Sequence, residues 1–210
     1  MELQEVNMER KVLRNLSYGV YIVGSKNETK NVGCTINSAV QITSDTIAIS
    51  IHHDNYTNEC IKNHRKFSLS ILKETSNPEI IGTFGYSSSK DQDKFEKYDM
   101  DYIDNLPVIK DNCGVITSEV INEVETETHT IFIGKILHTD HYTNESPMTY
   151  RYYHNVLKGK SPKNAPTYEK DEKKGWKCPI CGYVYEGESI PEDYRCPICG
   201  VEGSLFKIVD

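Results

Sequence analysis

Four cysteines near the C-terminus constrain this chain more than any other feature. They form two copies of the run Cys-Pro-Ile-Cys-Gly, and fourteen residues separate Cys181 from Cys196. Two residues between thiolates let one tight turn present both sulfurs to the same ion. Two such turns complete a tetrahedral four-sulfur site that suits zinc or a single iron. The expected metal ligands are Cys178, Cys181, Cys196 and Cys199, and their spacing leaves both metals open.

The segment that holds these cysteines is expected to be a separate domain, residues 176–210. It is too small to be held together by apolar burial alone, so a metal is expected to stabilise it. Residues 158–175 are rich in Lys and contain two Pro, with almost nothing to bury, and are predicted to be a linker. Residues 1–157 then form the first domain.

Charge and hydropathy exclude several classes of protein. The chain has 24 Lys and Arg against 31 Asp and Glu, a net charge of −7, so nucleic-acid binding is disfavoured. No apolar run approaches the ~20 residues that cross a bilayer. The charged N-terminus lacks the apolar stretch of a secretory signal, so we expect a cytoplasmic, reducing location in which paired thiols bind metal rather than form disulfides.

The first domain is predicted to be mainly β, with a few helices. Short β-branched runs separated by turns are typical of a barrel or sandwich. The expected strands are Val20–Gly24, Gly33–Ser38, Val40–Thr43, Thr46–Ile51, Phe67–Leu72, Gly114–Thr117, Ile121–Thr126 and Thr130–Leu137. Helices are expected over Lys11–Leu16, over Asn58–His64 with Thr57 as the N-cap, from Asn77-Pro78 to Phe84, and over Asp91–Tyr98.

The C-terminal domain resembles the rubredoxin family. The resemblance rests on the two cysteine pairs and on aromatic residues that would form a small core: Trp176, Tyr183, Tyr185, Tyr194 and Phe206. It implies one redox-active iron bound by the four cysteines. The short spacing between the pairs is similar to that of the compact rubredoxin module of rubrerythrins. Because four thiolates saturate the iron and leave no position for substrate, such a centre can change oxidation state or hold structure. A zinc ribbon is the alternative.

The first domain contains neither a Gly-x-Gly-x-x-Gly run nor a P-loop, which leaves a Rossmann nicotinamide site unsupported. It does carry small polar residues and lysines at the ends of expected elements. A mononucleotide such as FMN needs such groups for its phosphate and ring edge. Taken singly, each has a simpler explanation in turn chemistry or solvation.

Five runs of the first domain follow one another along the chain: Tyr18–Val23, Gly33–Ser38, Asn55–Ile61, Phe84–Phe95 and His129–Gly134. Together and in this order they resemble the flavin reductase-like family, which has the FMN-binding split β-barrel fold and is typically dimeric. The resemblance covers about residues 10–153 and implies roles for the following residues. Cys34, Thr35, Asn37 and Ser38 would line the isoalloxazine and ribityl groups. Thr57 and Lys94 would hold the phosphate near the loop of Ser87, Ser89 and Lys90, and the sequence leaves open which of the two lysines has this role. His129 would lie beside the ring, with Tyr168 or Tyr153 covering it.

The two domains together resemble the high-molecular-weight rubredoxin family, in which a flavoredoxin-type domain is fused to rubredoxin. The resemblance implies an NAD(P)H-dependent oxidoreductase that passes electrons through FMN to an Fe(Cys)4 centre and on to a flavodiiron protein. No catalytic acid or base is needed for this, and none is expected. The alternatives are a plain flavin reductase with a structural zinc ribbon, a protein- or RNA-binding module without redox cofactors, and a first domain that binds haem or a pyridoxal species.

Overall fold

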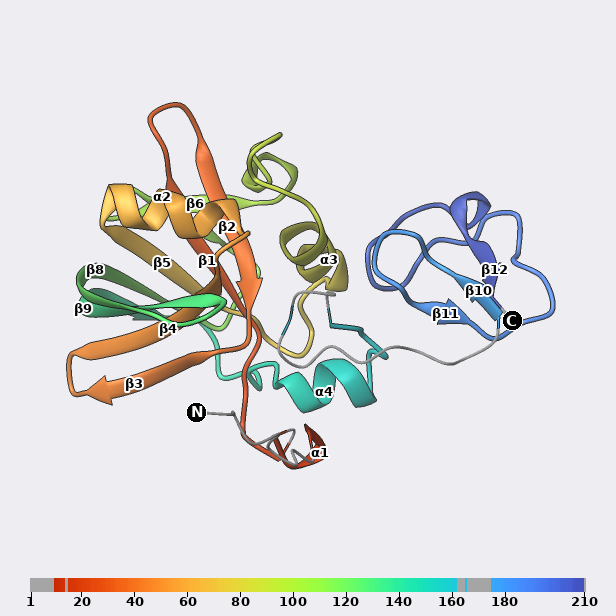
Figure 1. Cartoon of the computed structure of the whole chain (residues 1–210), viewed down its shortest axis with the longest axis horizontal. Helices are drawn as coiled ribbons and strands as arrows, with labels where there is room; N and C mark the ends of the chain where they lie inside the picture. Colours follow the sequence, from red (N-terminus) through yellow and green to blue (C-terminus); the bar gives the residue numbers. More distant parts are fainter. Residues whose placement is uncertain (1–9, 14, 162–164, 166–174, 210) are drawn as a thin grey trace, which may run out of the picture.

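The computed structural model describes residues 10–13, 15–161, 165 and 175–209 (Figure 1). Most of the first domain is one antiparallel sheet of seven strands in the order β2-β1-β5-β8-β9-β4-β3. The strands of this sheet are β1 (Tyr21–Lys26), β2 (Asn31–Ile36), β3 (Ala39–Thr43), β4 (Thr46–His52), β5 (Lys66–Ile71), β8 (Gly114–Glu125) and β9 (His129–His141). The mainly β prediction is confirmed.

The two edge strands of this sheet are consecutive in the chain. Strand β2 ends at Ile36 and β3 begins at Ala39, so only Asn37 and Ser38 connect one edge to the other. A connection of two residues requires the sheet to curl until its edges meet, which produces a barrel open at one seam. This is the geometry of the split β-barrel that the sequence predicted, and it places Asn37 and Ser38 at the seam.

The interior of the barrel is filled by alternate side chains of these strands together with one helix. Val23, Cys34, Ile61, Phe67 and Phe132 are among the fully buried members of this cluster. Because successive strand residues point to opposite faces, burial of Cys34 inside the barrel sends Thr35 to the outer face of β2. The predicted row of site residues on β2 is therefore divided between two faces.

Two helices pack against the barrel close to β2. Helix α2 (Tyr56–His64) was predicted with Thr57 as its N-cap, and this is wrong: the N-cap is Asn55, whose side chain accepts the Thr57 N–H. Asn is the stronger capping residue, and the Thr57 hydroxyl is turned inward instead. Helix α3 (Pro78–Tyr86) begins after the expected N-cap, Asn77. None of the helices among the described residues is long and apolar enough to cross a bilayer.

Other local predictions need correction. A helix was expected over Asp91–Tyr98, but the chain forms only the short 3-10 helix η1 (Phe95–Lys97), because the Asp93 carboxylate accepts the Phe95 N–H and the Asn31 amide. Two strands expected over residues 114–117 and 121–126 are one, β8, with register shifts after Thr117 and Val120. Helix α1 is limited to Arg10–Leu13.

Two further elements of the first domain were not predicted. Strands β6 (Met100–Ile103) and β7 (Leu106–Ile109) form a hairpin whose turn residues, Asp104 and Asn105, both have positive φ. Such a turn matches the twist of the paired strands. Helix α4 (Tyr150–Asn155) is capped by the Thr149 hydroxyl.

The C-terminal domain has three short strands in the order β11-β10-β12. They are β10 (Gly175–Lys177), β11 (Val184–Tyr185) and β12 (Lys207–Val209), with the 3-10 helix η2 (Gly203–Leu205) before the last. The predicted aromatic core is present: the rings of Tyr185 and Tyr194 lie 4.8 Å apart, and Phe206 meets Tyr194 edge-on at 5.6 Å. Buried residues of this domain join those of α3 and α4 in one cluster.

Candidate functional site

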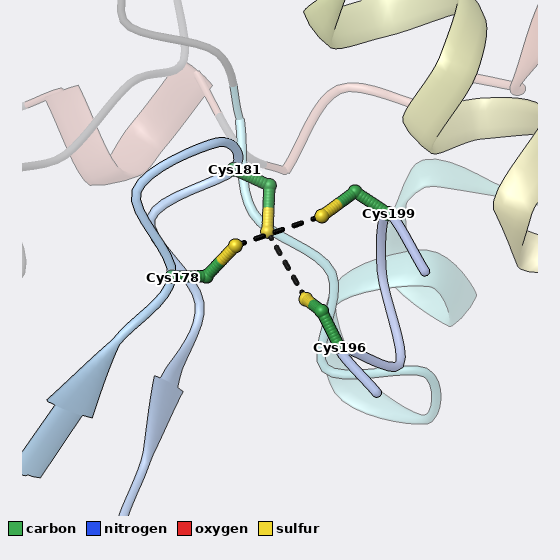
Figure 2. A group of neighbouring side chains, drawn as sticks. All are labelled: Cys178, Cys181, Cys196 and Cys199. Carbon is green, nitrogen blue, oxygen red and sulfur yellow. Dashed lines mark hydrogen bonds between the residues drawn. The ribbon is translucent and has the colours of Figure 1, made fainter. Parts of the chain in front are cut away.

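The structure brings the four predicted metal ligands together at one end of the C-terminal domain (Figure 2). All four sulfurs lie within 4.8 Å of one another. Cys178 Sγ is 3.6 Å from Cys199 Sγ, and Cys181 Sγ is 3.4 Å from Cys196 Sγ. A tetrahedral ion with metal–sulfur bonds of about 2.3 Å holds its sulfurs about 3.8 Å apart. The four thiols therefore fit a single metal ion with little rearrangement.

Each cysteine pair sits on the same kind of turn. In the first, Gly182 N–H donates to the Cys178 carbonyl and has a φ of 77°. In the second, Gly200 N–H donates to the Cys196 carbonyl with a φ of 70°. Glycine occupies both positions because a side chain is strained in this left-handed region. The two turns are thus equivalent in sequence and in backbone structure.

In the first domain, three of the predicted flavin-binding residues converge where β2, α2 and the chain after α3 meet. Burial raises the pKa of the Cys34 thiol to about 11, opposed by the positive charge of Lys94 and by the side chains of Thr57 and Asn55. These groups come from three separate parts of the chain, and each is close enough to change the ionisation of one thiol. Asn55, which the sequence analysis did not nominate, is part of this group. The sequence could have indicated Asn55 through its position two residues before Thr57, at the start of a predicted helix.

Lys94 is a buried cation without a carboxylate partner among the described residues. Only 1% of its surface is exposed, and its Nζ donates to the carbonyl oxygens of Ser87 at 2.8 Å and Phe84 at 3.1 Å. Desolvation lowers the pKa of Lys94 to about 8. A buried ammonium is costly unless an anion neutralises it, and two carbonyls leave one of its three N–H donors for such an anion. The site therefore fits a phosphate group.

Thr57 supplies a second observation of the same kind. Its hydroxyl oxygen is fully buried and lies near the Cys34 thiol, but it has no partner with hydrogen-bond geometry among the described residues. An unsatisfied buried hydroxyl destabilises a fold by about 1–3 kcal/mol, and natural structures rarely retain one without a reason. A bound phosphate or ribityl oxygen would satisfy it. Lys94 and Thr57 are therefore the residues whose surroundings fit FMN best.

The other predicted residues in this region are held by structural bonds. The Thr35 hydroxyl donates to the Ile81 carbonyl in α3, and the Ser38 hydroxyl donates to Asn37. The remaining three belong to the loop after α3. The Ser87 hydroxyl donates to the Thr83 carbonyl, Ser89 bonds to the backbone of Gly33, and Lys90 is exposed with its carbonyl accepting from Lys30. Burial thus distinguishes Lys94 from Lys90.

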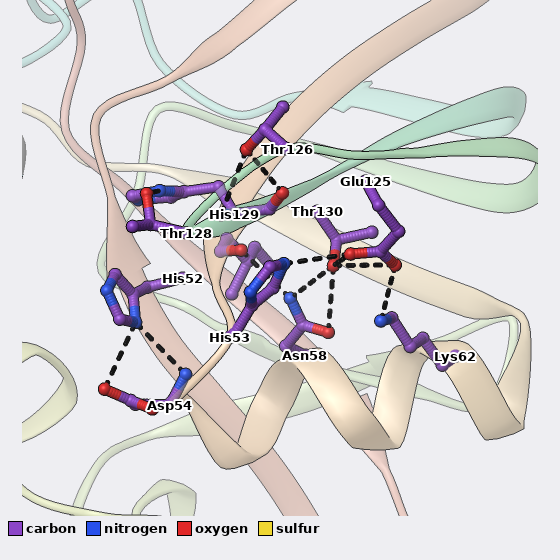
Figure 3. Close-up of polar contacts among 11 residues, drawn as sticks. His52, His53, Asp54, Asn58, Lys62, Glu125, Thr126, Thr128, His129 and Thr130 are labelled. Atoms are coloured by element: carbon purple, nitrogen blue, oxygen red, sulfur yellow. Dashed lines mark hydrogen bonds and ion pairs between the residues drawn. The ribbon is translucent and has the colours of Figure 1, made fainter.

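His129 lies in a separate polar cluster at the start of β9 (Figure 3). Its ring packs edge-on against His52 at 4.9 Å, and desolvation together with His52 and His53 lowers its pKa. Beside it, Glu125 pairs with Lys62 and His53. A cavity of about 260 Å³ is lined by residues of this cluster: His53, Asn58, Glu59, Lys62 and Glu125. Within the described part of the chain, the contacts of His129 are with His52, Thr126 and Thr128, so its place beside a flavin ring stays a prediction.

Two tyrosines are predicted to cover the flavin, Tyr153 and Tyr168. Tyr168 lies outside the described residues. Tyr153 is buried on α4, and its hydroxyl donates to the Lys160 carbonyl at 3.3 Å. The Tyr86 hydroxyl donates to the same carbonyl, and the Ser161 side chain is buried against Tyr150. The first residues of the predicted linker, 158–161, therefore pack on α3 and α4.

Two known domain families match successive parts of the chain. The flavin reductase like domain family matches residues 13–159, and the rubrerythrin, rubredoxin-like domain family matches residues 176–207. A high molecular weight rubredoxin of Moorella thermoacetica is 37% identical over 85% of this chain and 83% of its own length. A ferric-chelate reductase (NAD(P)H) of Archaeoglobus fulgidus is 31% identical over 77% of this chain and 98% of its own.

Solved structures support the fold of the first domain. The NADH:FAD oxidoreductase of Streptomyces globisporus superposes with a TM-score of 0.61 at 20% identity, covering 71% of this chain and 92% of its own. Flavoredoxin from Methanosarcina acetivorans superposes with a TM-score of 0.57 at 15% identity, covering 70% and 80%. The family matches confirm the expected cofactors, a flavin for the first domain and one iron ion for the four cysteines. The chain therefore belongs to the flavin reductase-like family and carries a rubredoxin-like domain after its flavin reductase-like domain.

Proposed function

We propose that this protein takes electrons from NAD(P)H, passes them through FMN to an iron ion held by the four cysteines, and delivers them to a partner such as a flavodiiron protein. The observation that carries the proposal is the packing of the second cysteine turn, Cys196–Gly200, against α3, a helix that also contacts β2 of the flavin domain. When bound, FMN supplies acceptance of a hydride and release of single electrons.

In such a reaction the residues of this chain bind and position the cofactors, which carry out the electron transfer. Lys94 and Thr57 bind the phosphate end of the cofactor and fix its position. Four thiolates saturate the iron, so the metal exchanges electrons without binding substrate. The similar ferric-chelate reductase is named for NAD(P)H, which supports the same donor here.

Anaerobic stopped-flow spectroscopy of the purified protein tests this proposal. On mixing with NADH or NADPH, the flavin absorption should bleach first and the ferric-thiolate absorption second. Cutting the chain near Lys170 should leave flavin reduction intact but abolish iron reduction at low, equal concentrations of the two pieces. Zinc in the four-cysteine site, or iron that stays ferric while the flavin is reduced, would show that the metal stabilises the domain and does not transfer electrons.

The partner is tested by reconstitution. A flavodiiron protein supplied with NAD(P)H and this protein should consume oxygen or nitric oxide, and removal of residues 176–210 should stop that consumption. A truncated chain that still supports it would show that electrons leave directly from the flavin. The free thiols and metal site also support a cytoplasmic location, where such partners are reduced.

We further propose that the protein is a homodimer formed through its flavin domain. Strand β3 is an edge strand of the sheet, and its apolar residues Val40 and Ile42 are exposed in the single chain. Exposed apolar side chains on an edge strand promote association with another chain, which removes them from water. Light scattering should give twice the mass of one chain, and Ile42→Lys should halve it. A wild-type monomer contradicts the proposal.

A further inference from the structure

The two Cys-Pro-Ile-Cys-Gly turns are identical in sequence but not in surroundings. Ile180, in the first turn, is 51% exposed, whereas Ile198, at the same position of the second turn, is completely buried. The two turns have the same sequence and the same backbone hydrogen bonds, so the difference comes from what packs against each of them.

Helix α3 is the element that covers the second turn, and it faces the C-terminal domain (Figure 1). The contact is made at Gly82. A Cβ atom built at this position would lie 2.4 Å from the Ile198 carbonyl oxygen and 2.6 Å from Cys199 Cα. Both neighbours are backbone atoms and cannot rotate away. Glycine disfavours the interior of a helix, so this close approach gives a physical reason for its presence.

A second residue of α3 joins the contact. A Cβ atom at Gly200 would lie 3.0 Å from Glu79 Oε1, whereas one at the equivalent Gly182 would meet only Lys177 Cε at 3.8 Å. Glu79 and Gly82 are three residues apart, so they lie on the same face of the helix. That face, made by Glu79 and Gly82, forms a seat for the turn Cys196–Gly200, whereas Ile180 of the turn Cys178–Gly182 stays exposed.

A different side of α3 rests on the flavin domain. The Ile81 carbonyl accepts the Thr35 hydroxyl, and a Cβ atom at Gly85 would meet Thr35 at 3.6 Å. Thr35 is next to Cys34, the thiol around which Lys94 and Thr57 converge. The single helix α3 therefore contacts both β2 and the second cysteine turn.

We propose that Gly82, together with Glu79, is a positioning residue that seats the Cys196–Gly200 turn for electron transfer from the flavin domain. The inference rests on the proposed function and adds the face through which the iron is reduced. With both cofactors bound, FMN would supply one electron and release the accompanying proton to solvent, and the four cysteines would hold the ferric ion that this electron reduces to ferrous. Ile180 of the turn Cys178–Gly182 is exposed to solvent.

Gly82→Ala tests the seat with a single methyl group. Alanine favours the helix over glycine, so the flavin domain should fold at least as well, but the methyl group collides with the backbone of the second turn. In small-angle X-ray scattering of the purified full-length protein, the radius of gyration should increase. Iron reduction after mixing with NADH should slow at least tenfold, while flavin reduction keeps its wild-type rate.

A matched pair of substitutions controls for changes within the C-terminal domain. Ile198→Ala leaves a gap against α3 and should shift both readouts in the direction of Gly82→Ala. Ile180→Ala removes the same atoms from the first turn and should leave both unchanged. The absorption spectrum and iron content of each variant should match wild type, which shows that the metal site is intact.

Two outcomes separate this inference from the function on which it rests. A Gly82→Ala protein that scatters and reduces its iron like wild type overturns the seat, even if electrons do pass from flavin to iron. A wild-type protein whose iron stays ferric overturns the proposed function instead, and scattering then decides independently whether α3 holds the second turn.

Discussion

Lys94 Nζ lies 2.8 Å from the Ser87 carbonyl oxygen, inside the flavin domain and almost fully screened from water. Phe84 provides a second carbonyl, and its ring centroid is 5.3 Å from the ammonium group. Neutral dipoles and a ring face stabilise a buried cation only in part. The ammonium group has neutral partners that leave its charge uncompensated, and this is the strongest local indication of where the cofactor phosphate binds.

Lys94→Met should therefore weaken FMN binding. Loss of a hydrogen bond to a charged group costs about 1.5–3 kcal/mol, which corresponds to a roughly 10- to 100-fold higher Kd. Fluorescence titration of the flavin-free protein measures this. The exposed Lys90 provides the control, because Lys90→Met should leave the Kd within a factor of about two. If Lys90→Met has the larger effect, the phosphate is bound by the other lysine.

FMN binding should also weaken as the pH rises above about 8. Desolvation lowers the pKa of Lys94 to about 8 in the free protein, so the ammonium is lost above that pH and the phosphate loses its counter-charge. Lys94→Arg, which keeps its charge, should remove this pH dependence if it binds FMN at all. Titrations between pH 6.5 and 9.5 measure the effect, and a flat wild-type profile would exclude Lys94 as the phosphate ligand.

The same shift affects the stability of the flavin-free protein. An unfolded lysine keeps a pKa near 10.4, so between about pH 8 and that value the unfolded chain binds more protons than the native one. The contribution of Lys94 to the free energy of unfolding therefore rises with pH across this window. In denaturant unfolding, the free energy of unfolding of wild type relative to Lys94→Met should rise with pH across this window, which isolates Lys94 from the other groups that titrate there.

Thr57→Val should separate stability from binding. Valine has the shape of threonine without the unsatisfied hydroxyl, so the flavin-free protein should become more stable by about 1–3 kcal/mol. FMN affinity should decrease because a donor to the cofactor is lost. In the control, Thr130→Val, the hydroxyl already bonds to Asn58 and Glu125, so its loss should lower stability. A Thr57→Val protein that gains stability and binds FMN normally would remove Thr57 from the site.

The sequence predicted the parts of this protein that follow from local pattern. Alternating apolar residues located the barrel strands, and the cysteine spacing located the metal site, because each depends on neighbours a few residues away. Burial of Lys94 could not be predicted in this way, since lysine is normally solvated and its environment is built from α3 and β2. The helix expected around it failed because Asp93 bonds to nearby backbone and side-chain groups instead.

The faces on which the predicted flavin-binding residues lie also depend on the strand boundaries. Cys34 and Thr35 are neighbours in β2 and point to opposite faces, whereas Asn37 lies beyond the end of that strand. The docking of the second cysteine turn could not be predicted from the sequence, because Gly82 does not differ from other helical glycines until the backbone that packs against it is known. Ile180 and Ile198 likewise differ only through tertiary contact.

Removal of one metal ligand should unfold the C-terminal domain without emptying the flavin site. A domain of this size depends on its metal for stability, so Cys196→Ser should lose the iron, its visible absorption and the hydrogen-exchange protection of β10 and β12. FMN content should stay at the wild-type level. Cys113→Ser is the control: Cys113 is a buried thiol of the flavin domain that donates to the Ile71 carbonyl, as serine also can, so iron and protection should both persist. A Cys196→Ser protein with one iron per chain and protected strands would mean that three thiolates suffice, and the closed four-sulfur coordination would have to be abandoned.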